Sequence, residues 1–196
     1  EDHLGSWFSG IENYPDGGVV RTFSRKKLEG IFDACGVTER SFYYPYPDYK
    51  FMTTVYSDAY LPGRGELSNN LRTFDRDRML LFDEKSAFDG IVEEGLFSVF
   101  SNSYMAIIGK PLELKYARYS NDRAENFRIR TEILRDGQGR RIVRKYPLTE
   151  EAQEHVRHMA SAYEKLKERY GGSQLEVNVC HLGEENGVPY AEFEFV

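Results

Sequence analysis

The sequence contains few of the residues that build disulfide or metal scaffolds. Of its 196 residues only two are cysteines, Cys35 and Cys180, and it holds no CxxC pair and no Cys/His cluster. Two cysteines so far apart exclude a disulfide framework and a zinc-finger type of site. No metal ligands are therefore predicted, and the sparse use of cysteine favours a reducing, cytoplasmic setting.

Long apolar runs are also missing, since none approaches the roughly 20 residues that a membrane helix needs. Hydrophobic residues make up 40% of the chain and charged residues 30%. This composition excludes a disordered protein and predicts a folded chain with no membrane span. The sequence has neither an initiator Met nor a signal-peptide pattern, and we therefore expect it to be a segment of a longer parent chain.

Charge is unevenly distributed along the sequence. The formal net charge is −6, yet the stretch from Arg118 to Lys145 carries nine Lys or Arg residues and only four Asp or Glu. Such a basic window can attract phosphate or an anionic glycan. Alternatively, arginines that alternate along the solvent face of a sheet keep it soluble and protect its edges. The basic residues lack the interleaved aromatics of single-strand binding proteins, so nucleic acid is not predicted as a partner.

Local patterns in the first half predict a mixture of helices and strands. Ser24 is a good helix cap, and Gly36 supplies a left-handed stop after an apolar repeat at three- and four-residue spacing. Two prolines interrupt an aromatic strand and place it at a sheet edge or before a loop. The expected elements are a helix over 24–35, a strand over 41–50 that continues through 51–56, short helices over 67–100 and a buried strand over 103–109.

The second half has a different pattern, and Lys110–Pro111 is the predicted boundary before it. Asp136–Gly139 is typical of a hairpin turn. Thr149 caps a long helix that Gly171–Gly172 ends, and one apolar stripe runs along it. The predicted strands cover 114–119, 127–134, 140–146, 175–182 and 189–196, with the helix between the third and the fourth.

This order of elements resembles the small lobe of a protein-kinase-like fold. Ile142–Lys145 is similar to the strand whose lysine holds the nucleotide phosphates, and the following helix should carry a glutamate that pairs with this lysine. Glu164 is the candidate, with Glu154 as its competitor. The resemblance implies that ATP and magnesium bind at Lys145 and Glu164. The segment 120–126 occupies the place of the glycine-rich loop but has no glycine, and the large lobe is not part of this chain.

The first half resembles the C-terminal part of a class I S-adenosylmethionine-dependent methyltransferase. Thr22–Glu29 with Ala34–Val37 is similar to the helix before the sixth strand of that family, and Tyr43–Lys50 with Phe100–Tyr104 is similar to its closing antiparallel strands. In that family the cofactor lies on a glycine-rich turn near the first strands, and this chain holds no GxGxG-type turn. The resemblance therefore implies that S-adenosylmethionine binds in the parent and not in this chain.

Together the two resemblances point to bacterial proteins of cell-surface polysaccharide synthesis, of the O-antigen type, in which a methyltransferase precedes a kinase-like module. The expected fold class is α/β with α+β character. We expect a methyltransferase-like segment over 1–110, with a helical insertion over 57–97, and a five-stranded kinase-like lobe with one long helix over 111–196. The expected function is that of a transferase fragment, inactive alone, whose partners are a saccharide or glycan acceptor and the rest of its own parent chain. The alternatives are a non-catalytic scaffold or glycan-binding module, and a metal-dependent glycosyltransferase domain.

Two groups of residues are candidates for the acceptor site. Glu1, Asp2 and His3 would follow the fifth methyltransferase strand, where a carboxylate and an imidazole can remove a proton from an acceptor hydroxyl. At a chain end these residues can equally be disordered. A second group can form a stacking platform for a sugar, or else an aromatic strand can cover its own core. That group comprises Tyr43, Tyr46, Asp48 and Tyr49.

Two further motifs are weaker. Asp75 and Asp77 resemble the Asp-x-Asp of metal-dependent glycosyltransferases, but the intervening Arg76 favours salt bridges on a helix surface. His155 and His158 are spaced to flank a metal only with a third ligand that the sequence does not supply, and both are predicted to be surface histidines.

Overall fold

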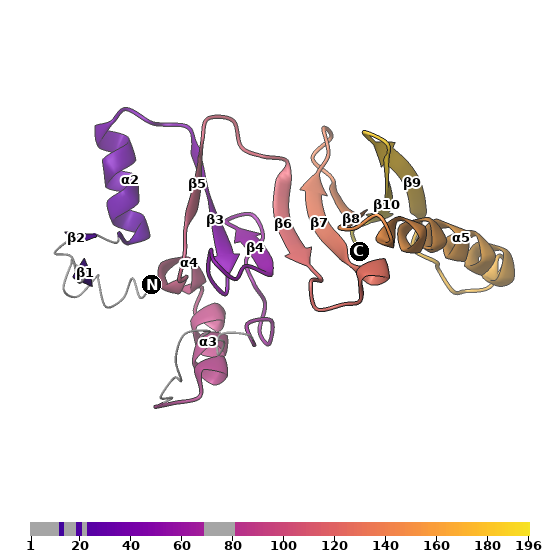
Figure 1. The fold of residues 1–196 in the computed structure, drawn as a ribbon, viewed down its shortest axis with the longest axis horizontal. Helices are drawn as coiled ribbons and strands as arrows, with labels where there is room; N and C mark the ends of the chain where they lie inside the picture. Colours follow the sequence, from indigo (N-terminus) through magenta and orange to yellow (C-terminus); the bar gives the residue numbers. More distant parts are fainter. Residues whose placement is uncertain (1–11, 14–18, 21–22, 69–80) are drawn as a thin grey trace. The chain divides into compact units, whose positions relative to one another are not determined.

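The protein is a mixed α+β chain whose sheets are antiparallel (Figure 1). The computed structural model describes residues 12–13, 19–20, 23–68 and 81–196. The chain divides into two compact units, Glu1–Pro111 and Leu112–Val196. Glu1, Asp2, His3, Asp75 and Asp77, all of which are sequence candidates, lie outside the described residues.

The first unit is built around the strand β3, which lies between β5 and β4. The helix α2 precedes β3 and begins after Ser24, whose hydroxyl accepts a hydrogen bond from the Lys27 amide. Gly36 follows with a φ of 74°, so the predicted cap and left-handed stop are both confirmed. The elements of this unit are β1 (Glu12–Asn13), β2 (Val19–Val20), α2 (Arg25–Ala34), β3 (Arg40–Tyr46), β4 (Thr54–Ser57), α3 (Glu84–Glu93), α4 (Phe97–Phe100) and β5 (Met105–Ile108).

Aromatic side chains fill the core of this unit. Tyr44 is fully buried, and its ring meets those of Phe97 and Tyr104 edge-on at centroid distances of 5.6 and 6.0 Å. Its hydroxyl donates to Asp58 and accepts from Arg25, and the Arg25 guanidinium also donates to both Asp58 oxygens at 2.7 and 2.9 Å. Burial raises the pKa of Tyr44 most, and the Asp58 carboxylate raises it further. This network joins α2 to the sheet.

The strand predicted over 103–109 differs from expectation. β5 is present, but it is not buried, because Met105 is 37% and Ile108 is 62% exposed. β5 pairs only with β3 within this unit, so it forms an edge of the sheet. An apolar run of four residues cannot distinguish a central strand from an edge strand, and the prediction of a buried strand is wrong.

The second unit is a five-stranded antiparallel sheet in the order β6-β7-β8-β10-β9, and the long helix α5 packs against β8, β10 and β9 (Figure 1). The predicted sequence of three strands, one helix and two strands is confirmed. α5 begins at Ala152, three residues after the predicted cap Thr149, and the Thr149 hydroxyl does accept from the Ala152 amide at 3.2 Å. The elements are β6 (Leu114–Tyr119), η1 (Glu125–Phe127), β7 (Ile129–Arg135), β8 (Arg141–Pro147), α5 (Ala152–Tyr170), β9 (Cys180–Glu185) and β10 (Val188–Glu194).

The core of the second unit lies between α5 and one face of this sheet. Val156 on the helix is fully buried against Ile129, Cys180 and Ala191 on three different strands. The apolar stripe is therefore buried along the first half of the helix, whereas Leu166 in its second half is 43% exposed.

Candidate functional site

Lys145 lies near the end of β8, on the sheet face that α5 covers. Its register partners are Thr131 on β7 and Ala191 on β10, and Ala191 belongs to the core under the helix. Successive side chains of a strand point to opposite faces, so Lys145 shares the helix-covered face with Ala191. The Lys145 ammonium lies 5.2 Å from the centre of the Phe193 ring.

His155 and Arg123 are two further basic residues that belong to the region around Lys145. His155, in the first turn of α5, has its pKa lowered by burial and then by the positive charges of Arg123, Lys145 and His158. Arg123 belongs to the segment between β6 and β7, and Lys145 to β8. Basic groups from a loop and a strand therefore act on the His155 imidazole of the helix at one end of this unit.

No carboxylate compensates these charges within the part of the chain that the structure describes. Lys145, Arg123 and His155 form no salt bridge there, and the groups that shift the pKa of His155 include no acid. A set of neighbouring positive charges without counter-charges attracts an anion. We take Lys145, Arg123 and His155 as the candidate site, and call them the cationic cluster.

The loop that carries Arg123 is fixed at both of its ends. The Ser120 hydroxyl accepts from the Ile129 amide and donates to the Ile129 carbonyl, each at 2.9 Å. The Thr149 hydroxyl donates to the Glu125 carbonyl at 2.6 Å, and Phe127 meets the His155 ring edge-on at 5.1 Å. The loop without glycine is thus attached to the start of α5, next to the cationic cluster.

The pairing implied for Lys145 and Glu164 is not formed in the structure. Glu164 is exposed on α5, and no salt bridge joins it to Lys145 within the described residues. The competing Glu154 instead lies 3.0 Å from Nε2 of His158. The lysine–glutamate pair therefore stays a prediction.

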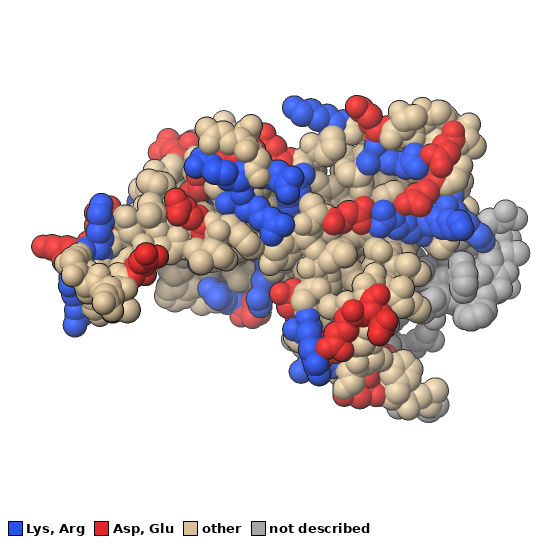
Figure 2. Space-filling model, turned by 180° about the vertical axis from the view of Figure 1, so that it is seen from behind, with Lys and Arg blue, Asp and Glu red and all other residues tan. Residues whose placement is uncertain are grey.

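The opposite face of the sheet is electrically balanced. Arg144, next to Lys145 in sequence, lies between Glu132 on β7 and Glu192 on β10, and its Nη2 lies 3.1 Å from Oε2 of Glu192. Arg130 lies 2.7 Å from Glu132, and burial raises the pKa of Glu132 although both arginines lower it. Figure 2, which shows one side of the molecule, has blue and red side chains interspersed over the surface that is seen.

Tyrosines complete that balanced face. The rings of Tyr146 and Tyr190 stack at 5.9 Å with an angle of 16°, and the Arg144 guanidinium lies 4.3 Å from the centre of the Tyr190 ring. The Tyr146 hydroxyl donates to a Glu185 carboxylate oxygen at 3.1 Å. The Arg144 guanidinium and the Tyr146 hydroxyl thus already have partners within the sheet.

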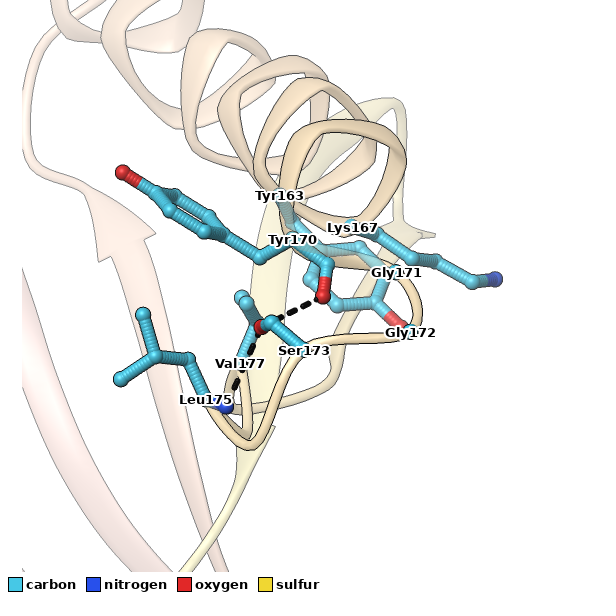
Figure 3. Close-up of a pocket in the computed structure, with 8 residues that line it drawn as sticks. All are labelled: Tyr163, Lys167, Tyr170, Gly171, Gly172, Ser173, Leu175 and Val177. Atoms are coloured by element: carbon cyan, nitrogen blue, oxygen red, sulfur yellow. Dashed lines mark hydrogen bonds between the residues drawn. The ribbon is translucent and has the colours of Figure 1, made fainter.

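A small open pocket of about 170 Å³ lies at the C-terminal end of α5 (Figure 3). The Ser173 hydroxyl closes its loop by donating to the Tyr170 carbonyl at 2.7 Å and accepting from the Leu175 amide at 3.2 Å. Figure 3 shows the Lys167 ammonium extending away from this loop. The pocket therefore offers phenol rings and a satisfied backbone, with no charge directed into it.

The predicted sugar platform is mostly buried. Tyr43 is 2% and Tyr46 is 5% exposed, so both rings contribute to the core of the first unit. Asp48 uses one carboxylate oxygen to accept from the Lys50 and Phe51 amides at 2.7 and 2.9 Å. Only Tyr49 of the four is exposed, at 54%.

Sequence reasoning missed two members of the cationic cluster. His155 is half-buried against Phe127, whereas it was predicted to be a surface histidine; His158 is exposed as predicted. Arg123 was included only as one of nine basic residues of its window. No sequence signal distinguishes Arg123 from its neighbours, because the fold of the 120–126 loop decides which cations lie beside α5.

Comparisons of the chain with family models, with curated proteins and with solved structures found no match. Among the described residues, no group of three or more His, Cys, Asp or Glu side chains is arranged to hold a metal ion. No helix in the described ranges combines the length and the apolar character that crossing a membrane requires.

Proposed function

We propose that the chain is part of a transferase of bacterial surface-polysaccharide synthesis, and that its second unit is a kinase-like lobe in which Lys145 holds the phosphate groups of a nucleotide. In this proposal residues 1–110 are the closing segment of an S-adenosylmethionine-dependent methyltransferase that acts on a saccharide acceptor. In this proposal the cofactor does not bind to this segment, whose sequence holds no GxGxG-type turn.

One observation carries the proposal for the second unit. Lys145 is located near the end of the third of five antiparallel strands, on the face covered by the helix that follows. The glutamate pair that the resemblance also implies is not formed among the described residues. The element order and the position of the lysine are those that the resemblance to a kinase-like small lobe implies. A partly buried ammonium without a counter-charge loses solvation, and a bound phosphate would restore favourable electrostatic energy.

The missing glycines change how phosphate would be held. A glycine-rich loop lets backbone amides approach phosphate closely, whereas the 120–126 loop is attached to α5 through Thr149 and Phe127. In this lobe the side chain of Arg123 can supply the positive charge from the loop. Glu164 would then serve as an anchor for Lys145 once the nucleotide is bound.

A thermal-shift titration of the full chain with magnesium ATP tests the proposal. At a ligand concentration about 100-fold above its dissociation constant, binding stabilises the native state by about 2.7 kcal/mol. We expect this stabilisation for the native chain and its loss in Lys145→Ala. Lys167→Ala is the matched control, because this lysine lies on the same unit and interacts with the Tyr163 ring instead.

Two outcomes would contradict the proposal. Stabilisation by ATP that persists in Lys145→Ala would show that the nucleotide binds elsewhere. Stabilisation by an anionic polysaccharide such as dextran sulfate, with no response to ATP, would favour the glycan-binding scaffold instead.

A further inference from the structure

One member of the cationic cluster, His155, is a histidine, and the charge of a histidine side chain can change near neutral pH. Lysine and arginine side chains ordinarily keep their charge over the physiological pH range, whereas the imidazole of histidine titrates in it. We infer that His155 is a proton-linked third cation of the phosphate site, so that the second unit binds nucleotide phosphate more tightly as the pH falls. This inference rests on the proposed function of Lys145.

The position of His155 supports this role. Its ring is fixed by the edge-on contact with Phe127 at 5.1 Å, and Phe127 ends the 3-10 turn that follows the Arg123 loop. It lies in the first turn of α5, one residue before the fully buried Val156. His155 is therefore a partly buried helix residue whose ring contacts the turn after the Arg123 loop.

The charged groups around His155 set its protonation state. Arg123 acts on it from the loop, Lys145 from β8 and His158 from its own helix, and all three are basic. Together with burial they lower the pKa of His155 below its ordinary value. Glu154, which precedes His155 in the sequence, forms a salt bridge with His158 at 3.0 Å.

The sign of the coupling follows from these charges. Without a ligand, burial and then the cationic neighbours lower the pKa of His155 and so favour its neutral form. A bound phosphate adds negative charge to the cluster and raises the pKa of the imidazole, so binding takes up a proton. By linkage, affinity then rises as the pH falls through this range, and a shift of one pKa unit corresponds to at most about a tenfold change in the dissociation constant.

The test is calorimetric titration of the full chain between about pH 5.5 and about pH 8, the range in which histidine titrates. Magnesium ATP is one probe, and sulfate is the second because its own charge is constant over this range. We expect the dissociation constant for each probe to fall about tenfold from the upper to the lower pH. His155→Gln should abolish this dependence, and the control His158→Gln should retain most of it.

A second measurement does not depend on the folding of a variant. The pKa of the His155 ring, followed by NMR in the native chain, should rise when sulfate or ATP is added. If ATP binding requires Lys145 but neither its affinity nor the pKa of His155 responds as described, the role of His155 is refuted and the proposed function stands. If ATP does not bind, or if binding is indifferent to Lys145→Ala, both fail together.

Discussion

The packing of α5 on the sheet predicts a large stability difference between two substitutions on the same helix. Val156 is fully buried against β7, β9 and β10, whereas Leu166, ten residues later on the same apolar stripe, is 43% exposed. Both changes to alanine remove apolar carbon atoms, but only the first leaves a cavity. Burial, and not the apolar character of the residue, should therefore decide the cost.

The magnitude follows from the atoms that are removed. Val156→Ala deletes two buried carbon atoms at about 0.8 kcal/mol each, and the unfilled space adds a cavity term, giving about 2–3 kcal/mol in total. The better helix propensity of alanine returns about 0.5 kcal/mol. For Leu166→Ala we expect a loss below about 1 kcal/mol, since its side chain remains in contact with water in the native state.

Urea unfolding followed by far-ultraviolet circular dichroism measures both variants. α5, with 19 residues, is the longest helix in the described part of the chain and gives a strong signal. With a slope of about 2 kcal/mol per molar urea, Val156→Ala should lower the transition midpoint by about 1 M without changing the slope. Equal midpoints for the two variants, or a larger loss for Leu166→Ala, would refute the packing of α5 described above.

Three further predictions concern single contacts. Gly183→Ala should destabilise the second unit by about 1–3 kcal/mol, measured by thermal unfolding, because an added Cβ would overlap the ring of Tyr190; an unchanged midpoint would show that the ring moves without cost. Glu132→Gln should remove one pH dependence of stability. Burial raises the pKa of the Glu132 carboxyl in the native state, so the native state holds the proton more tightly than the unfolded state does. The free energy of unfolding therefore falls as the pH rises above the ordinary pKa of a glutamate. Urea titrations over this pH range should show the decline in the native chain and a smaller one in the variant; parallel curves would contradict it. Tyr44→Phe should cost about 1–3 kcal/mol in chemical unfolding, because the buried hydroxyl that donates to Asp58 is lost, and a neutral result would exclude a stabilising role for this hydrogen bond.

Much of the second unit could be predicted from the sequence because its signals are local. The hairpin at Asp136–Gly139 depends on a few adjacent residues, and Gly139 has the positive φ of 80° that such turns favour. The apolar stripe of α5 is likewise encoded within the helix itself. These features do not depend on which other segments the element meets.

The features that the sequence did not predict depend on residues that are distant from them in the sequence. β5 is exposed because it lies at the edge of the sheet, and strand order is not encoded in four apolar residues. Arg25 and Asp58 are 33 positions apart, and no sequence pattern predicts their contact. Tyr43 and Tyr46 are buried, in agreement with the alternative of an aromatic strand that covers its own core. Their burial depends on which residues pack over β3.

The basic window illustrates the same limit for function. A count of charge treats Arg144 and Lys145 as equivalent, yet strand alternation sends them to opposite faces. Arg144 meets Glu132 and Glu192, so its charge is used within the sheet, whereas Lys145 faces α5 with no acid beside it in the described residues. The basic residues of the window therefore lie on different faces: paired arginines cover one side of the sheet, whereas Lys145 lies on the helix side, where the described residues form no salt bridge with it. An anion that interacts with this unit should consequently respond to substitution of Lys145 and remain almost indifferent to substitution of Arg144, a contrast between adjacent residues that net charge alone cannot produce.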